Sequence, residues 1–180
     1  MRYTLLLFLV FQCLVSAGQK TASTDLSLTL PPVALVDIMP TVGNNVTLTM
    51  TAPTEAGNAV GTGTSNATNW LVLTSAVATG ASRSIRGNIS GVLPAGVKLR
   101  LNVAAYAGSG QGFTGGLSAV TSPVYLSVAP STIISNIHGA YTGITAGSGF
   151  RLTYTLEIDA YTNIRSGTSN VTVIYTITDN

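Results

Sequence analysis

One stretch of the chain decides its fold class: Phe150-Arg151-Leu152-Thr153-Tyr154-Thr155-Leu156-Glu157-Ile158. Apolar side chains occupy every second position of this stretch, and arginine, threonine or glutamate fills the positions between them. Successive side chains of an extended strand point to opposite faces, so the pattern predicts a β-strand with one face in a core and the other in solvent.

The same period of two recurs elsewhere in the chain. It is clear in residues 97–103 and 171–177, shorter in residues 46–50, and weaker around residues 70–73 and 124–128. Glycine, asparagine and proline separate these runs, and no window shows sustained helical spacing of apolar residues. Several strands joined by polar turns predict an all-β protein, built as an antiparallel β-sandwich.

The first seventeen residues have the features of a secretory signal peptide. Arg2 supplies a positive start, residues 5–11 form a short apolar run, and Val15-Ser16-Ala17 is a small-residue cleavage pattern. No later segment approaches the roughly 20 apolar residues that a spanning helix needs. We therefore expect a signal peptide over residues 1–17 and a mature chain that is secreted to the cell surface without a stable membrane span.

The composition disfavours several classes of partner. Cys13 is the only cysteine and lies within the expected signal peptide, so the mature chain is predicted to have no disulfide. Charged residues make up 8% of the chain, well below the roughly 25% of ordinary soluble domains. Lys+Arg 8 against Asp+Glu 6 leaves no basic footprint for nucleic acid. A weakly charged surface rich in β-forming residues instead predicts association between protein chains.

The sequence contains no recognisable set of catalytic or metal-binding residues. His138 is the only histidine, so a serine–histidine–aspartate arrangement has no second candidate. Glu157 and Asp159 lie on the face of their strand that is predicted to be in solvent, where carboxylates are ordinary. The glycine-rich run 108–112 lacks the lysine of a phosphate-binding loop. We expect the protein to have no cofactor or metal and not to be an enzyme.

Residues 18–32 form an N-terminal extension ahead of a predicted sandwich domain at residues 33–180. Within it, Asp25-Leu26-Ser27-Leu28-Thr29-Leu30 alternates cleanly, and Pro31-Pro32 interrupts any continuous strand. An exposed strand of this kind invites pairing with another chain. Leu26, Leu28 and Leu30 either enter a neighbouring copy by donor-strand addition or belong to the first strand of their own domain. The sequence leaves both alternatives open.

Both ends of the mature chain carry a family resemblance. The N-terminal segment consists of Thr21-Ala22-Ser23-Thr24, the alternating extension and the two prolines. The C-terminal segment is Ser166-Gly167-Thr168-Ser169-Asn170-Val171-Thr172-Val173-Ile174-Tyr175-Thr176-Ile177-Thr178. These segments resemble those of chaperone–usher fimbrial subunits, in particular the cysteine-free capsule-forming type, and of related spore-coat-type secreted β domains. Gly167 matches the family's glycine before the last strand. Asp179 stands where the family often has a tyrosine, and Tyr175 lies further in.

The resemblance implies an immunoglobulin-like sandwich that is completed by a neighbour's extension. The pairing residues would be Leu26, Leu28 and Leu30 of the extension, together with the C-terminal strand residues Gly167, Val171, Val173, Tyr175 and Ile177. The implied partners are copies of the chain itself, a periplasmic chaperone and an outer-membrane assembly protein.

The function expected from these observations is that of a secreted, self-associating structural subunit of a pilus, fimbria or surface layer. The alternative is a self-complete secreted adhesin or carbohydrate-binding module, which would use the glycine-rich loop at residues 108–116 and exposed aromatic side chains.

Overall fold

The computed structural model describes residues 21–180 except 41–42, 44, 114–117 and 120–122. The predicted signal peptide, residues 1–17, lies outside the described residues, as do residues 18–20 of the expected extension. One compact unit runs from Pro31 to Asn180, and the chain up to Leu30 forms a separate unit. Residues 21–32 are exposed and carry no strand.

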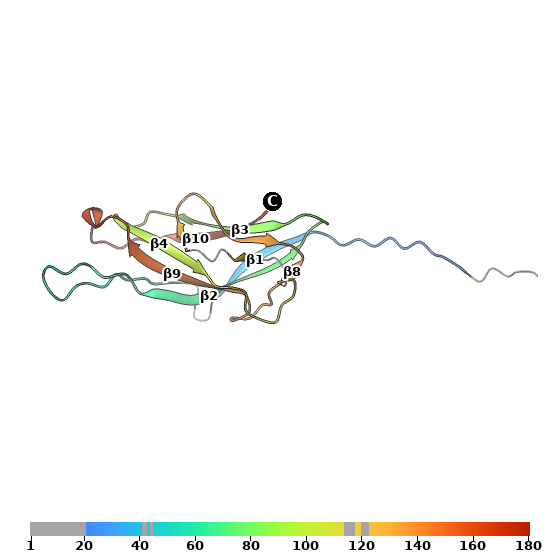
Figure 1. Cartoon of the computed structure of the whole chain (residues 1–180), viewed down its shortest axis with the longest axis horizontal. Coiled ribbons are helices and arrows are strands. Elements are labelled where there is room, and N and C mark those ends of the chain that lie inside the picture. Colours follow the sequence, from blue (N-terminus) through green and yellow to red (C-terminus); the bar gives the residue numbers. More distant parts are fainter. Residues whose placement is uncertain (1–20, 41–42, 44, 114–117, 120–122) are drawn as a thin grey trace, which may run out of the picture. The chain divides into compact units, whose positions relative to one another are not determined.

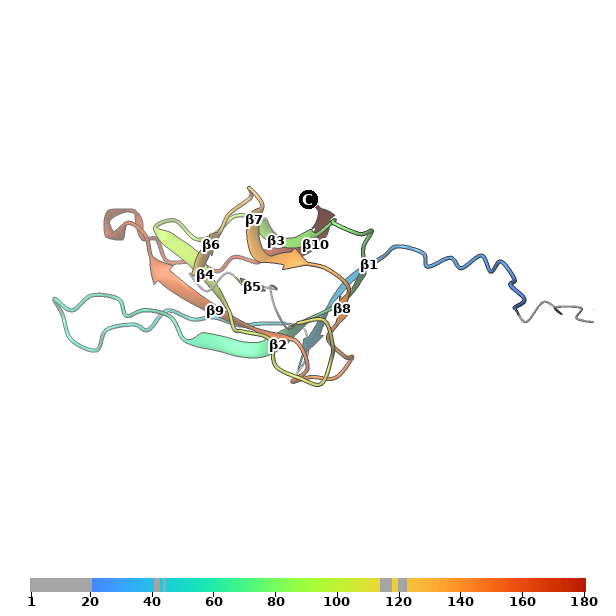
Figure 2. The ribbon, with the colours of Figure 1, turned by 45° about the vertical axis from the view of Figure 1, so that its right-hand side comes forward.

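The compact unit is built from two antiparallel sheets (Figures 1 and 2). The first has the order β1-β2-β9-β4-β6, and β8 also pairs with β2; the second has the order β10-β3-β7-β5. The first sheet comprises β1 Val33–Pro40, β2 Ser65–Ala76, β9 Phe150–Ile158, β4 Val97–Val103, β6 Val124–Leu126 and β8 Ala140–Tyr141. The second comprises β10 Thr172–Asp179, β3 Arg83–Ser90, β7 Ser131–Ile137 and β5 Ser118–Ala119.

The predicted fold class is confirmed: the described residues form an all-β sandwich, whose only helical turn is the short 3-10 segment η2 at Tyr161–Asn163. The stretch that decides the fold is β9, with the bounds expected from its alternation, and residues 97–103 are β4. Among the residues described, no helix is long and apolar enough to cross a membrane.

The prediction of a strand at residues 46–50 is wrong. The segment alternates as expected, since Val46 and Leu48 are half-buried and pack against the core while their neighbours are exposed. Its backbone, however, makes no strand ladder; Thr49 accepts one hydrogen bond from the Thr64 amide (3.1 Å), and Thr51 bridges to Gly61. Alternation reports one buried face, and it does not report whether a partner strand lies alongside.

The core lies between the two sheets and consists of the side chains at alternate strand positions. Leu71, Leu101 and Leu152 face it from the first sheet, and Ile85 and Ile133 face it from the second. Each of these side chains is at most 1% exposed. Burial of these apolar faces is the main force that holds the sheets together.

Replacement of a core isoleucine tests this packing. Ile85→Ala should lower the free energy of unfolding by about 2–5 kcal/mol, because it removes buried methyl groups and leaves a cavity. The matched control Ile144→Ala changes a side chain that is 82% exposed and should shift stability by no more than about 0.5 kcal/mol. Denaturant titration followed by the fluorescence of Trp70, the single tryptophan, measures both. Equal losses for the two variants would contradict the assigned core.

Candidate functional site

The outer strands β1 and β10 lie side by side at one edge of the sandwich, one from each sheet, and we call this region the β1–β10 edge. β10 pairs along its whole length with β3, from Thr172 opposite Ser90 to Asp179 opposite Arg83. Within the described residues, no strand pairs with the other side of β10. This side of β10 therefore presents backbone N–H and C=O groups that have no ladder partner.

The side chains of β10 at this edge are only partly covered. Val173, Tyr175 and Ile177 point toward the core and pack against it, yet each is half-buried rather than fully buried. From β1, Val36 and Ile38 pack against the same core and are also half-buried. If a further strand covered these apolar side chains, the removal of their exposed surface from water would stabilise the protein.

Four of the five predicted C-terminal pairing residues lie on β10 or directly before it. Val173, Tyr175 and Ile177 lie on β10 and pack against the core. Val171 is half-buried and directly precedes the strand. Gly167 is separated from them: it lies in the exposed segment that precedes β10, and a Cβ added there would meet no atom within 4 Å.

A buried polar cluster joins the two sheets below the β1–β10 edge. The hydroxyl groups of Tyr154, on β9, and Tyr175, on β10, lie 2.6 Å apart, and the side chain of Asn69, on β2, hydrogen-bonds Tyr154. Burial raises the pKa of both tyrosines above the usual value of 10.0, and in Tyr175 the neighbouring Tyr154 adds to the effect. Asn69 is 4% exposed, and its Oδ1 has no hydrogen-bond partner among the described residues.

Arg83 ties β1 and β10 together at one end of this edge. Its residue is 6% exposed, and its Nε lies 2.6 Å from Asp179 Oδ1 on β10. Its terminal nitrogen Nη1 donates to the backbone carbonyl of Val33, the first residue of β1, and to the carbonyl of Ala76 at 3.1 Å. A buried guanidinium needs such partners, since burying an unpaired charge is costly.

Sequence reasoning missed Arg83, Asn69 and Tyr154 as parts of this site. Asn69 and Tyr154 could have been found from the sequence, because each places a polar group in phase with the apolar face of its strand. Arg83 carried none, because its partners Val33 and Asp179 are 50 and 96 residues away along the chain.

The extension, described by itself, exposes all three of its predicted pairing residues. Leu26, Leu28 and Leu30 are 79%, 91% and 85% exposed. They lie at every second position, so all three would point to the same side if the segment paired as a strand. Large apolar side chains exposed in a row are rare on a protein surface without a binding role.

The residues considered for catalysis take part in local contacts. The ring nitrogens of His138 lie 2.9 Å from the Ala81 carbonyl and 3.1 Å from Asn136 Oδ1. Glu157 pairs with Arg100 (2.9 Å) and accepts a hydrogen bond from the Tyr125 hydroxyl (3.0 Å). In the part of the chain that the structure describes, no three potential metal ligands come together.

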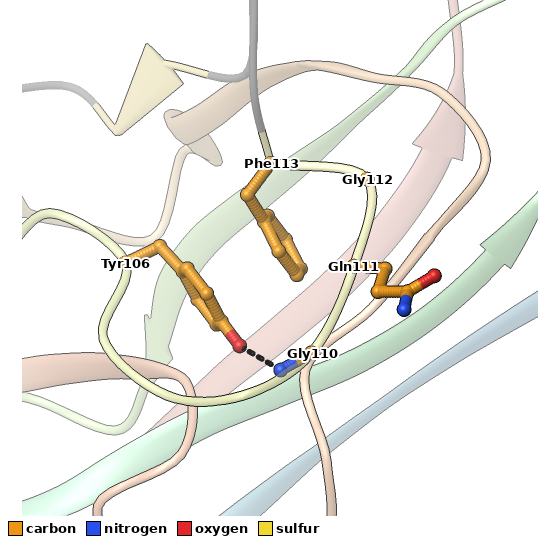
Figure 3. A pocket seen from close by; sticks show the side chains of 5 residues that line it. All are labelled: Tyr106, Gly110, Gln111, Gly112 and Phe113. Atoms are coloured by element: carbon orange, nitrogen blue, oxygen red, sulfur yellow. Dashed lines mark hydrogen bonds between the residues drawn. The ribbon is translucent and has the colours of Figure 1, made fainter.

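A second candidate site is the glycine-rich loop after β4, of which residues 114–116 lie outside the described residues (Figure 3). It borders an open hollow of about 510 Å3, lined by Tyr106, Gly110, Gln111, Gly112 and Phe113. The rings of Tyr106 and Phe113 stack on each other with centroids 3.8 Å apart. The Tyr106 hydroxyl accepts a hydrogen bond from the Gly110 amide (2.6 Å), which links two positions of the loop four residues apart.

Comparison with known proteins adds no relative. No protein-family model matches the chain, and neither a curated protein nor a solved structure does.

The tyrosine pair predicts how stability depends on pH. Because the neutral phenols are favoured in the folded state, the unfolded chain releases their protons first as the pH rises. The stabilisation by Tyr154 and Tyr175 should thus be complete below about pH 10 and fall progressively above it. Tyr175→Phe should reduce this loss, while the control Tyr141→Phe, at a residue that is 46% exposed, should not. Denaturant titrations across the alkaline range measure it, and identical pH dependence in all three chains would contradict the cluster.

Proposed function

We propose that the chain is a secreted, self-associating structural subunit of a pilus, fimbria or surface layer. In this proposal, the extension of one copy pairs with the free side of β10 in the next copy. The observation that carries the proposal is that β10 has one side without a partner strand among the described residues, while a separate, exposed segment alternates like a strand.

The strand order supports an immunoglobulin-like reading of the sandwich. In the constant-type immunoglobulin fold, strands A, B, E and D form one sheet and C, F and G form the other. The order β1-β2-β9-β4 corresponds to A-B-E-D, and the neighbours β3 and β10 correspond to C and F. The final strand G would pair with the side of β10 that lacks a partner among the described residues. A neighbour's extension would take the place of this strand.

The chemistry of the two segments is complementary. Leu26, Leu28 and Leu30 repeat every second residue, as do Val173, Tyr175 and Ile177 on β10. Paired strands therefore bring the two apolar rows to the same face, where the leucines would cover the half-buried side chains. The backbone of the extension would supply the hydrogen bonds that the free side of β10 lacks.

The proposal also concerns how the chain reaches its site of assembly. A free strand side next to partly exposed apolar residues is a risk for aggregation. A periplasmic chaperone that covers this edge, and an outer-membrane protein that exchanges the chaperone for the next subunit, would remove that risk. Residues 1–17, with the pattern of a signal peptide, support export.

One aspartate in the extension tests the proposed pairing. Leu28→Asp should abolish assembly, because a carboxylate would be buried against the apolar row of β10. Thr29→Asp is the matched control, since residue 29 points to the opposite side of the strand. Gel electrophoresis of unboiled and boiled samples in detergent measures assembly, because intersubunit strands that resist detergent come apart only on heating.

Folding of the single chain is the second readout of that experiment. Leu28 is 91% exposed, so Leu28→Asp should change the unfolding free energy of the monomer by no more than about 0.5 kcal/mol. A heat-sensitive ladder of bands in wild type and Thr29→Asp, but not in Leu28→Asp, is expected. The proposal is wrong if Leu28→Asp forms the same ladder.

The second candidate function is a self-complete adhesin or carbohydrate-binding module. The observation that favours it is the hollow beside Tyr106 and Phe113, since aromatic side chains and glycine amides commonly line ligand sites. Binding by this loop should appear on a glycan array and should be lost in Phe113→Ala. Trp70→Ala, which changes the single tryptophan and lies outside the loop, is the control. An array without a specific glycan would remove this candidate.

A further inference from the structure

The two chain segments at Val33 and Asp179 meet at one end of the β1–β10 edge. Arg83 binds the carbonyl of Val33 and the carboxylate of Asp179 at the same time. The last residue of β10 therefore lies close to the point where the chain enters β1. Because Val33 is held there by a buried side chain, the first residue of β1 is fixed at this end of the edge.

If the proposed function is assumed, two pairings of the extension compete with each other. An extension could pair with the β10 strand of its own chain as well as with that of a neighbour. A segment tethered to its own binding site has an effective concentration on the order of millimolar. At micromolar protein, self-pairing would therefore be favoured by about a thousandfold over pairing with a second copy, if its geometry were permitted. Open polymers need a feature that prevents self-pairing.

The direction of the chain shows where that feature has to act. To lie along its own β10, the extension would have to reverse direction between Leu30 and Val33, at the end of the edge where Arg83 sits. Only Pro31 and Pro32 are available for that reversal. A wider turn would use Leu30 itself and remove one of the three leucines from the pairing.

Two consecutive prolines are unsuited to a tight reversal. Two-residue hairpin turns require positive φ at one or both central residues, whereas the proline ring holds φ near −65°. A proline also restricts the residue before it to extended backbone, so Leu30 and Pro31 are both held extended. Proline pairs of this kind act as semi-rigid spacers. Pro31 and Pro32 are both exposed in the structure, so packing of their side chains does not explain why prolines occupy these two positions.

We propose that the junction Pro31-Pro32-Val33, fixed by Arg83, keeps the extension from pairing with its own β10 and so directs it to a second copy of the chain. The two prolines make the junction stiff. Arg83 keeps the first residue of β1 bound to the sandwich, so that β1 cannot shorten to leave residues for a turn. The junction decides between a closed monomer and an open polymer, while the leucines provide the pairing itself.

A flexible junction tests this inference. The test variant replaces Pro31 by glycine and Pro32 by serine (Pro31→Gly, Pro32→Ser) and adds a short glycine–serine insert after them. The control variant Pro53→Gly removes an exposed proline from the loop that follows residue 51, far from the junction in sequence. Hydrogen exchange of the amides of residues 21–30 in the monomer fraction reports self-pairing, and the heat-sensitive ladder reports assembly.

The flexible-junction variant should show protected amides in residues 24–30 of the monomer, at a rate independent of protein concentration. Its ladder should weaken by at least about tenfold, since the tethered strand now occupies β10 first. Wild type and Pro53→Gly should show an unprotected extension in the monomer and a full ladder.

The outcomes separate this inference from the proposed function. A full ladder and an unprotected extension in the flexible-junction variant would overturn the role of the prolines while leaving intermolecular pairing intact. A wild-type chain that forms no ladder at all would overturn the proposed function and this inference with it.

Discussion

The constraint on which the rest of this structure depends is that the backbone of a β-strand has hydrogen-bonding groups on two sides. Among the described residues, β10 has a partner strand on only one of them. Most of the sandwich meets this requirement within itself, because β2, β9, β4, β3 and β7 each lie between two neighbours. At β10, the second partner has to come from water or from another strand. The half-buried state of Val173, Tyr175 and Ile177 is the side-chain counterpart of the same deficit.

The polar residues near this edge can be understood as its supports. Arg83 connects the outer strands of the two sheets, so the edge stays closed at the end where β1 begins. Tyr154 and Tyr175 connect the sheets through their hydroxyl groups, and burial raises the pKa of both above its ordinary value. These polar links between the sheets limit how far the two outer strands can separate.

The two candidate functions use different parts of the molecule and make different demands on it. Pairing with a second copy uses the extension and β10, needs no ligand, and benefits from a chain with few charges. Ligand binding uses the loop beside Tyr106 and Phe113, where the two rings already stack on each other. The first function explains why three leucines are exposed in a row and why two prolines follow them; the second leaves both features without a role.

The sequence by itself determined the fold class and the positions of β4 and β9, because alternation is a local property of the chain. It placed Thr155 on the solvent face of β9, where the structure buries it. It also singled out the extension and the C-terminal strand, since both carry that alternation. Residues 46–50 show the limit: their pattern was right about burial and wrong about pairing. Only the tertiary structure decided that β10 pairs with β3, that Tyr154 meets Tyr175, and that Arg83 joins Val33 to Asp179. Those contacts form between residues far apart along the chain, and the spacing of side chains within one segment contains no information about which other segment will lie beside it.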